Sequence, residues 1–190
     1  EKYLEQKRKF FPRFYFVSDT VLLKFLSQGS DPESVKDDFD KLFDSVADVQ
    51  LSYGDAKKKS KEASITQIMD VIGDKEVEIN KERIHLVNPV ICQNNIEDWL
   101  GELERSMQLT LKTLIYKCYS KFVAQKEPMD TGAMLNETCG QVALIAIQMR
   151  WTKLIQDSFM ERQNMKAKAY GEARNEIKSI LDFMTDLCKT

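Results

Sequence analysis

Few residues in this 190-residue chain have the types and spacing that catalysis or metal binding requires. His85 is the single histidine, which excludes a metal site built on two histidines and disfavours a cysteine–histidine catalytic pair. Tyr3 and Lys7 have a Y-x-x-x-K spacing, but no glycine-rich turn between a strand and a helix accompanies them. We therefore interpret His85 as a structural or surface residue and expect no catalytic residue in this chain.

Two clusters of like charge are candidates for ion or partner binding. The acidic cluster Asp37, Asp38 and Asp40 lacks the central glycine of a calcium loop, so a solvated helix face is the favoured interpretation. The lysine-rich run 57–61 could bind an acidic partner surface, although a flexible loop kept soluble by its charge is favoured. No G-x-x-x-x-G-K-[ST] motif is present, and Gly73 stands without a phosphate-binding loop. We expect no cofactor and no metal in these residues.

The composition excludes several other classes of protein. The 28 basic residues nearly balance the 30 acidic residues, which argues against a nucleic-acid partner. No apolar run approaches the roughly 20 residues of a membrane span, and no secretory signal is recognisable, so we expect no membrane partner. The four cysteines lack a C-x-x-C pair, which predicts reduced, mostly buried thiols in a cytoplasmic protein. Because residue 1 is Glu, we expect a piece of a longer protein.

The most informative elements lie near the N-terminus, where five aromatic residues occur in the seven positions 10–16, here called the aromatic elbow. Pro12 disfavours helix at the residue before it, so a basic first helix is predicted to end near Phe10 or Phe11. Each aromatic side chain could gain roughly 1.5–3 kcal/mol on burial. We therefore expect the elbow to pack, between two helical layers in preference to forming a contact surface for another domain. Ser18 and Asp19 are predicted to open the next helix.

Residues 31–87 are predicted to form a helix, a loop and a small sheet. Asp31 and Pro32 begin a predicted helix of about five turns, with apolar residues at steps of three and four: Val35, Phe39, Leu42, Val46 and Val49. The periodicity lapses in the segment 51–63. Strand patterns at 64–72 and 75–79 flank Gly73 and Asp74, and residues 84–87 could add a third strand.

The second half is predicted to be helical. A long helix capped by Asn94 or Asn95 carries an apolar stripe from Ile96 to Phe122, and a break follows at Pro128 and Gly132. Residues 142–151 are apolar nearly all round, which predicts a central helix of a bundle, and a last amphipathic helix covers 170–187. Core positions are predicted for two tryptophans and four methionines: Trp99, Trp151, Met107, Met149, Met160 and Met184.

These patterns predict a mainly α fold of elongated helical bundles with a short antiparallel β ribbon. The predicted parts are an N-terminal helical lobe with the aromatic elbow (1–50), a flexible loop (51–63), a β ribbon (64–90) and an antiparallel helical bundle (91–190). The loop and the break at 125–132 are the predicted hinges, because both are expected to have few buried contacts.

Three tracts occur in a fixed order along the chain. Residues 4–32 read LEQKR-x-FFPRFYFVSD-x-x-LL-x-x-LSQGSDP, residues 95–107 include IEDWL and ERSM, and residues 140–152 begin GQV and end RWT. Together they resemble the linker region of dynein heavy chains, in its central to C-terminal part. The ribbon at 69–77 departs from the family pattern, and Arg150 stands where an aliphatic residue is usual. The third tract and the ribbon resemble axonemal more than cytoplasmic chains.

The resemblance implies a lever and not an enzyme. In that family the linker precedes the first AAA+ module, lies across the ring of modules and swings with its nucleotide state, so that the motor moves along microtubules. It implies that ATP and Mg are bound elsewhere in the parent chain. The implied partners are the AAA+ ring of the same chain and, for the parent complex, microtubules and other dynein chains. The implied location is cytoplasmic or cytoskeletal, in a cilium or axoneme. A spectrin-like helical scaffold that binds partner proteins is the alternative.

Overall fold

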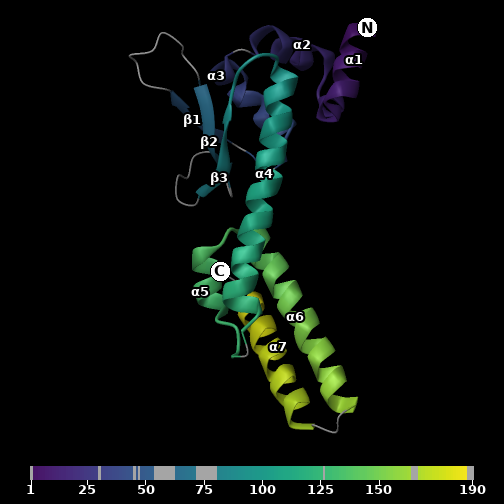
Figure 1. Cartoon of the computed structure of the whole chain (residues 1–190), viewed down its shortest axis with the longest axis vertical. Coiled ribbons are helices and arrows are strands. Elements are labelled where there is room, and N and C mark those ends of the chain that lie inside the picture. Colours follow the sequence, from purple (N-terminus) through teal and green to yellow (C-terminus); the bar gives the residue numbers. More distant parts are fainter. Residues whose placement is uncertain are drawn as a thin grey trace. The chain divides into compact units, whose positions relative to one another are not determined.

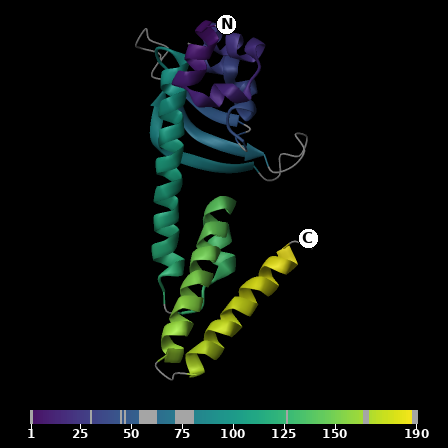
Figure 2. The same ribbon diagram turned by 90° about the vertical axis from the view of Figure 1, so that its right-hand side faces the viewer.

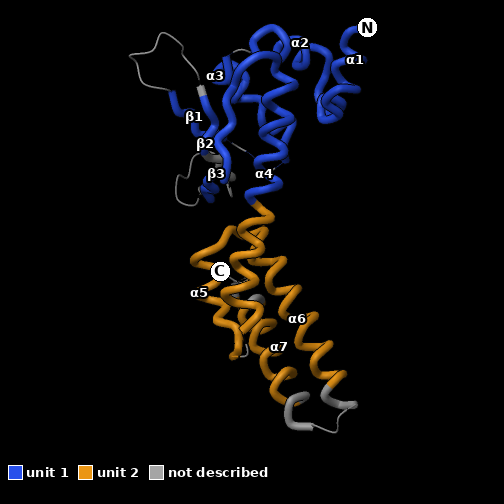
Figure 3. Tube along the Cα trace, viewed as in Figure 1, with its two compact units in different colours: residues 1–110 blue, residues 111–190 orange. Residues whose placement is uncertain are grey.

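The structure, a computed structural model, describes residues 2–29, 31–44, 46, 48–53, 63–71, 81–125, 127–163 and 167–187. The chain divides into two compact units, residues 1–110 and residues 111–190 (Figure 3). The first unit combines short helices with a three-stranded antiparallel sheet, and the second is helical (Figure 1). The fold is therefore mainly α with a small antiparallel sheet, as predicted. The division falls inside α4 (Ile96–Cys118), within the stretch 91–190 that was predicted to form one bundle.

The aromatic elbow forms a short 3-10 helix, η1 (Pro12–Phe16), between α1 (Lys2–Phe10) and α2 (Asp19–Gln28). The predicted end of α1 is confirmed, and so is the Ser18 cap, whose hydroxyl accepts a hydrogen bond from the Val21 amide at 3.4 Å. A 3-10 helix has three residues per turn, so Phe11, Phe14 and Val17 share one side, and all three are buried. Phe10, Tyr15 and Phe16 are exposed. The expectation that the whole elbow packs is therefore wrong for three of its five aromatic residues.

The five-turn helix predicted after Asp31 is also wrong. Asp31 does cap a helix, but α3 spans only Pro32–Val35, a 3-10 helix η2 follows at Lys36–Lys41, and the chain enters strand β1 at Asp48. The apolar positions that suggested a helix are nevertheless buried, in α3, in η2, in the connection that follows and in β1. Steps of three and four do not distinguish these elements over so short a segment, and the aspartates disfavour a continued helix.

The sheet has the strand order β1-β2-β3 and is formed by β1 (Asp48–Tyr53), β2 (Ala63–Val71) and β3 (Lys81–Ile91). The strands predicted at 64–72 and 84–87 are confirmed over their described residues, 64–71 and 84–87. The predicted flexible loop 51–63 is wrong at residues 51–53 and 63, which pair in the sheet. The lysine-rich run, the turn at Gly73 and the strand predicted at 75–79 lie outside the described residues.

The pairing of β2 with β3 is interrupted by a bulge. Ile65 pairs with Val90 and Gln67 with His85, so residues 86–89 of β3 lie opposite the single residue Thr66. Two hydroxyls of α4 bind the backbone of this bulge: the Val87 amide donates to Thr110 Oγ1 at 3.0 Å, and Ser106 Oγ donates to the Asn88 carbonyl at 2.6 Å. These contacts satisfy backbone groups that the bulge removes from the ladder.

In unit 1 the short helices, the sheet and the first part of α4 lie side by side (Figure 2). Their buried side chains form one hydrophobic core. Its largest fully buried side chains are those of Trp99, Phe14, Phe25 and Phe39. The Trp99 indole donates to the Gly29 carbonyl at 3.0 Å, which brings the end of α2 against the start of α4. The prediction that Trp99 is a core residue is confirmed.

In unit 2 the α4 helix continues through a π-helical turn, η4 (Tyr119–Val123), which confirms the helix predicted from Ile96 to Phe122. A break follows, then α5 (Thr131–Glu137), and then the antiparallel hairpin of α6 (Gly140–Gln163) and α7 (Ala167–Leu187) (Figure 2). Helix α6 contacts η4, α5 and α7, as a central helix should. The side chains of Trp151, Met149 and Met160 on this helix are nevertheless exposed, so their predicted core positions are wrong. The side chain of Met184 is outside the described residues.

Candidate functional site

Tyr3 and Lys7, whose spacing suggested chemistry, form a structural contact. The Tyr3 side chain is exposed, and its ring lies 5.6 Å from Lys7 Nζ. Lys7 Nζ donates to the buried carboxylate of Glu97 at the start of α4, and this hydrogen bond raises the pKa of Lys7. His85, on β3, is exposed. The structure therefore brings Lys7 together with Glu97 as an ion pair between α1 and α4.

The elbow is attached to its surroundings by two arginines. Arg8 donates to the carbonyls of Phe14 and Val17 at 3.2 and 3.1 Å, and so binds the backbone at the far end of η1. Arg13 donates to Glu104 on α4 and to the Leu42 carbonyl, each at 3.1 Å. Arg8 thus holds α1 to the elbow, and Arg13 holds the elbow to α4.

The acidic cluster divides into one buried and two exposed carboxylates. Asp37 and Asp40 are exposed, as predicted for a solvated face, but Asp38 is buried. Asp38 accepts hydrogen bonds from Lys24 at 2.5 Å and from Lys41, and these bonds hold the pKa of Asp38 below its ordinary value of 3.8. The prediction of a solvated face is therefore wrong for Asp38, because two lysines compensate its burial.

Arg150 forms a buried polar centre in unit 2, in the position where the sequence departs from the family pattern. Its Nε and Nη2 donate to the two carboxylate oxygens of Glu176, on α7, at 2.7 and 2.9 Å. The guanidinium also donates to the Val123 carbonyl at the end of η4, and to the carbonyls of Gln125 and Glu127 in the break that follows, at 2.7–3.1 Å. Only 3% of the Arg150 side chain and 10% of the Glu176 side chain are exposed. The predicted scarcity of buried contacts at 125–132 is therefore wrong.

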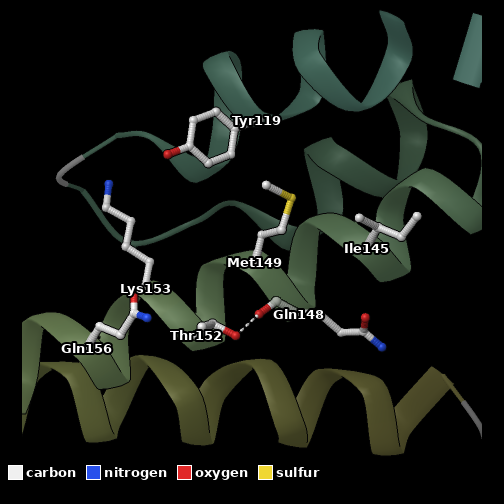
Figure 4. A pocket seen from close by; sticks show the side chains of 7 residues that line it. All are labelled: Tyr119, Ile145, Gln148, Met149, Thr152, Lys153 and Gln156. Atoms are coloured by element: carbon white, nitrogen blue, oxygen red, sulfur yellow. Dashed lines mark hydrogen bonds between the residues drawn. The ribbon is translucent and has the colours of Figure 1, made fainter. Parts of the chain in front are cut away.

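The exposed face of α6 carries two adjoining cavities of about 430 and 290 Å³. Both are lined by Gln148, Thr152 and Gln156, which lie four residues apart and form a row along the helix. The larger cavity extends toward Tyr119 of η4 (Figure 4), and the smaller one toward Trp151 and Ile155. A row of side chains with a depression on each side has the shape that a second helix fills.

The cysteines are buried thiols in the part of the chain that the structure describes. Cys92, Cys118 and Cys139 are buried and free, which confirms the predicted state for these three, and Cys188 lies outside the described residues. Burial raises the pKa of Cys92 to about 12, and burial together with the nearby Cys139 raises the pKa of Cys118. Protonated, buried thiols are poor nucleophiles and poor metal ligands at neutral pH.

The sequence patterns did not predict two features of unit 2, the buried Arg150–Glu176 pair and the cavities on α6. The Arg150–Glu176 pair joins residues that are 26 positions apart, so no local spacing could reveal it, although the unusual arginine was itself a signal. The cavities on α6 lie on a helix whose apolar residues were predicted to be in the core.

Among the described residues, no group of histidine, cysteine and carboxylate side chains is placed to hold a metal ion. No described helix has the length and apolarity needed to cross a bilayer.

Comparison with known proteins gives consistent matches. Residues 1–118 match the family described as dynein heavy chain, N-terminal region 2. The chain is 32% identical over 155 residues to dynein axonemal heavy chain 2 of Mus musculus, covering 80% of this chain and 3% of the relative. It is 32% identical over 171 residues to the dynein-1-beta heavy chain of the flagellar inner arm I1 complex of Chlamydomonas reinhardtii, covering 87% and 4%. It is 27% identical over 181 residues to cytoplasmic dynein 2 heavy chain 1 of Rattus norvegicus, covering 95% and 4%. The chain thus spans 3–4% of the length of these relatives.

Proposed function

The chain belongs to the dynein heavy-chain family, and from this premise we propose that residues 1–190 are part of the linker of such a heavy chain. In this role they act as a mechanical lever, which converts nucleotide-dependent changes of an AAA+ ring into displacement. The single observation that carries the proposal is the match of residues 1–118 to an N-terminal region of dynein heavy chains, which includes the elbow, the sheet and α4.

The packing of unit 1 supports a mechanical role. A lever must resist deformation, and resistance comes from dense side-chain contacts together with buried polar groups whose partners are fixed. Phe14 and Phe25 stack at 6.3 Å between ring centroids, and Phe39 lies 6.1 Å from Trp99. The ion pairs of Lys7 and Arg13 add polar contacts from the N-terminal helices to α4. Three elements, α1, η1 and η2, are thus attached directly to α4.

The proposed partners and location follow from the family. The nearest partner is the AAA+ ring of the same polypeptide, and ATP and Mg are bound there and not by these residues. The parent complex binds microtubules and other dynein chains. The axonemal and flagellar names of several relatives favour a ciliary or flagellar axoneme as the location. A purely helical, spectrin-like scaffold is less well supported, because unit 1 contains a three-stranded sheet.

The experiment uses the full heavy chain that contains this sequence. Residues 1–190 are replaced by a flexible glycine–serine segment, which keeps the chain connected but transmits no force. Microtubule-stimulated ATP turnover and the velocity of microtubule gliding are measured on the same preparation. A lever predicts that ATP turnover persists while gliding is lost. A heavy chain with the single exposed substitution Lys2→Ala is the control and should glide normally.

Two results would contradict the proposal. If ATP turnover and gliding fall together, these residues are needed to assemble or activate the ring. If neither changes, the residues do not transmit the stroke.

A further inference from the structure

A cavity of about 240 Å³ lies in unit 1, where the bulge of strand β3 meets helix α4. The two elements run beside each other at this point (Figure 1). The cavity is lined from β3 by Asn88, Pro89 and Val90, and from α4 chiefly by Glu102, Arg105 and Leu109. It opens to the surface, so a side chain of another molecule could enter it.

The β3 wall of this cavity is held in place by two buried hydroxyl groups. Ser106 Oγ donates to the Asn88 carbonyl at 2.6 Å. Thr110 Oγ1 accepts from the Val87 amide at 3.0 Å and donates to the Ser106 carbonyl at 2.7 Å. Ser106 is 6% exposed and Thr110 1%. Because the bulge is fixed before anything binds, binding there costs little free energy of ordering.

The side of the cavity next to the bulge offers apolar groups to a partner. Pro89 is exposed and Leu109 is 42% exposed, and both line the cavity. Val87, two residues before Pro89, is 49% exposed. Bulges commonly re-aim side chains beside functional sites, and exposed apolar groups gathered around a depression gain free energy when a partner removes them from water. The cavity is therefore suited to an apolar side chain.

The polar side of the cavity carries two charges. Arg105 is exposed and forms no hydrogen bond or ion pair with any residue that the structure describes. Glu102, one helical turn earlier, is likewise exposed and has no such bond to the described residues. A guanidinium presents its donors in a planar fork that matches a carboxylate. A complementary partner therefore places a carboxylate against Arg105.

The order of charges along α4 determines the direction of such a partner. Every charged residue of α4 before Arg105 is acidic, and every one from Arg105 to the end of the helix is basic. The helix macrodipole accounts for charges in the first and last turns, such as Glu97 and Lys117, but not for Arg105 in the middle. Because Glu102 repels a second carboxylate, the acidic residue of the partner lies on the side of the cavity away from Glu102.

We propose that this cavity binds an acidic segment of a separate polypeptide, whose carboxylate pairs with Arg105 and whose neighbouring apolar side chain enters between Pro89 and Leu109. Charged groups beside apolar ones are typical of interfaces that form and dissociate, whereas permanently covered surfaces are more apolar. The occupant is for this reason a partner chain and not another part of the heavy chain. The inference rests on the proposed function in one respect, that the heavy chain is assembled with other dynein chains.

The test places a photocrosslinker in the cavity of the full heavy chain within its assembled complex. The residue p-benzoylphenylalanine replaces Leu109, the purified complex is irradiated, and crosslinked peptides are identified by mass spectrometry. We expect a crosslink to a peptide of another polypeptide that has an aspartate or glutamate next to an apolar residue. The same crosslinker at Gln50, an exposed residue of the opposite outer strand β1, is the control and should not reach that peptide.

Two charge reversals test the role of Arg105. Arg105→Glu should lower the yield of the crosslink from position 109 by roughly tenfold or more, because it sets two carboxylates against each other. Arg105→Lys keeps the charge but loses the fork, so its yield should be intermediate. Replacing the identified partner carboxylate by lysine should restore crosslinking to the Arg105→Glu complex. The pattern of limited proteolysis should not change, since Arg105 bonds to no described residue.

Several results would overturn the inference. A crosslink only to peptides of the heavy chain would show that the occupant is not a separate polypeptide. A crosslink to a peptide without a carboxylate, one that survives Arg105→Glu, or one that the partner reversal fails to restore would show that charge pairing is not its basis. Absence of any crosslink would show that the cavity is not an interface.

These outcomes are distinct from failure of the proposed function. Gliding and ATP turnover do not enter the crosslinking readouts, so a negative result here leaves the lever role standing. Failure of the shared premise would be seen earlier, as a heavy chain that purifies without other chains.

Discussion

The guanidinium of Arg150 and the carboxylate of Glu176 form a bidentate ion pair between α6 and α7, with N–O distances of 2.7 and 2.9 Å. The same carboxylate accepts a hydrogen bond from the Met129 amide at 3.1 Å. Arg150 also binds the carbonyl of Val123 at the end of η4 and those of Gln125 and Glu127 in the break after it. One buried pair thus fixes the end of η4, the break and the two helices of the hairpin. Within unit 2, the break that follows η4 is thereby held to the helical hairpin.

Arg150→Met should destabilise unit 2 strongly. The substitution leaves the Glu176 carboxylate and three carbonyls buried without their donor, and removing one partner of a buried pair costs about 3–5 kcal/mol. Urea unfolding followed by circular dichroism measures the loss. The double substitution Arg150→Met with Glu176→Met should cost less than the sum of the two single changes. Lys153→Met, at a partly exposed position of the same helix, is the control. A stable Arg150→Met variant would contradict the assigned role.

Phe14→Ala should lower the stability of unit 1 by about 3–5 kcal/mol, because its fully buried ring contacts Phe11 and Phe25. Phe16→Ala removes an aromatic ring from the same 3-10 helix, but that ring is 75% exposed, so the change should stay within about 0.5 kcal/mol. The fluorescence of the buried Trp99 reports unfolding of unit 1 in both variants. Equal losses of stability in the two variants would show that Phe14 and Phe16 do not differ in burial as described.

Asp38→Asn should lower stability by about 1 kcal/mol near neutral pH, since it replaces a carboxylate bonded to two partly exposed lysines. The pKa of Asp38 is lowered in the folded state, so its carboxylate contributes stability above 3.8 and loses that contribution as the pH falls through the folded-state pKa. The stability difference between the two proteins should therefore shrink below pH 3.8. Urea unfolding at a series of pH values measures it. A difference that stays constant on acidification would argue against this role of Asp38.

Cys92 should be inert to iodoacetamide in the folded protein. Burial raises its pKa to about 12, so almost none of the reactive thiolate is present at neutral pH, and the sulfur is also inaccessible. Peptide mass spectrometry after labelling, with and without urea, measures the modification at this position. Rapid labelling of Cys92 without denaturant would show that the segment directly after β3 opens readily.

Gly29→Ala should destabilise the junction of α2 and α4. A Cβ atom at Gly29 would lie 2.4 Å from the Ile96 Cβ atom and 2.7 Å from the Phe25 carbonyl oxygen, so one of the helices must shift. We expect a loss of about 1–3 kcal/mol, as for other overpacked cores. Gly171→Ala is the matched control, because a Cβ there meets no atom within 4 Å and alanine favours helix. Urea unfolding compares the two, and a harmless Gly29→Ala would contradict the close approach.

Local signals in the sequence predicted the ends of several elements correctly. Pro12 ended α1, and the side chains of Ser18 and Asp31 cap the helices that they were expected to begin. The stripe from Ile96 to Phe122 predicted the longest helical stretch because steps of three and four over so many residues fit only a helix. These features depend on interactions between near neighbours, which a sequence displays directly.

Contacts between distant segments could not be predicted in this way. The residues around Phe39 are buried in a 3-10 helix and a strand, because the sheet, and not the helical period, determines their position. On α6, an apolar residue such as Trp151 looks like a core residue, but half of such a helix surface can be left for another segment. Only the three-dimensional structure shows that Glu176 is the partner of Arg150.

The bulge of β3 has a consequence for the behaviour of the protein at high concentration. β3 is an outer strand of its sheet, and an outer strand with regular unpaired amides and carbonyls can recruit strands from other molecules. Here Ser106 and Thr110 occupy the Asn88 carbonyl and the Val87 amide, and Pro89 has no amide hydrogen to offer. The middle of this outer strand is thereby protected from strand addition, which guards a protein with an exposed edge against aggregation.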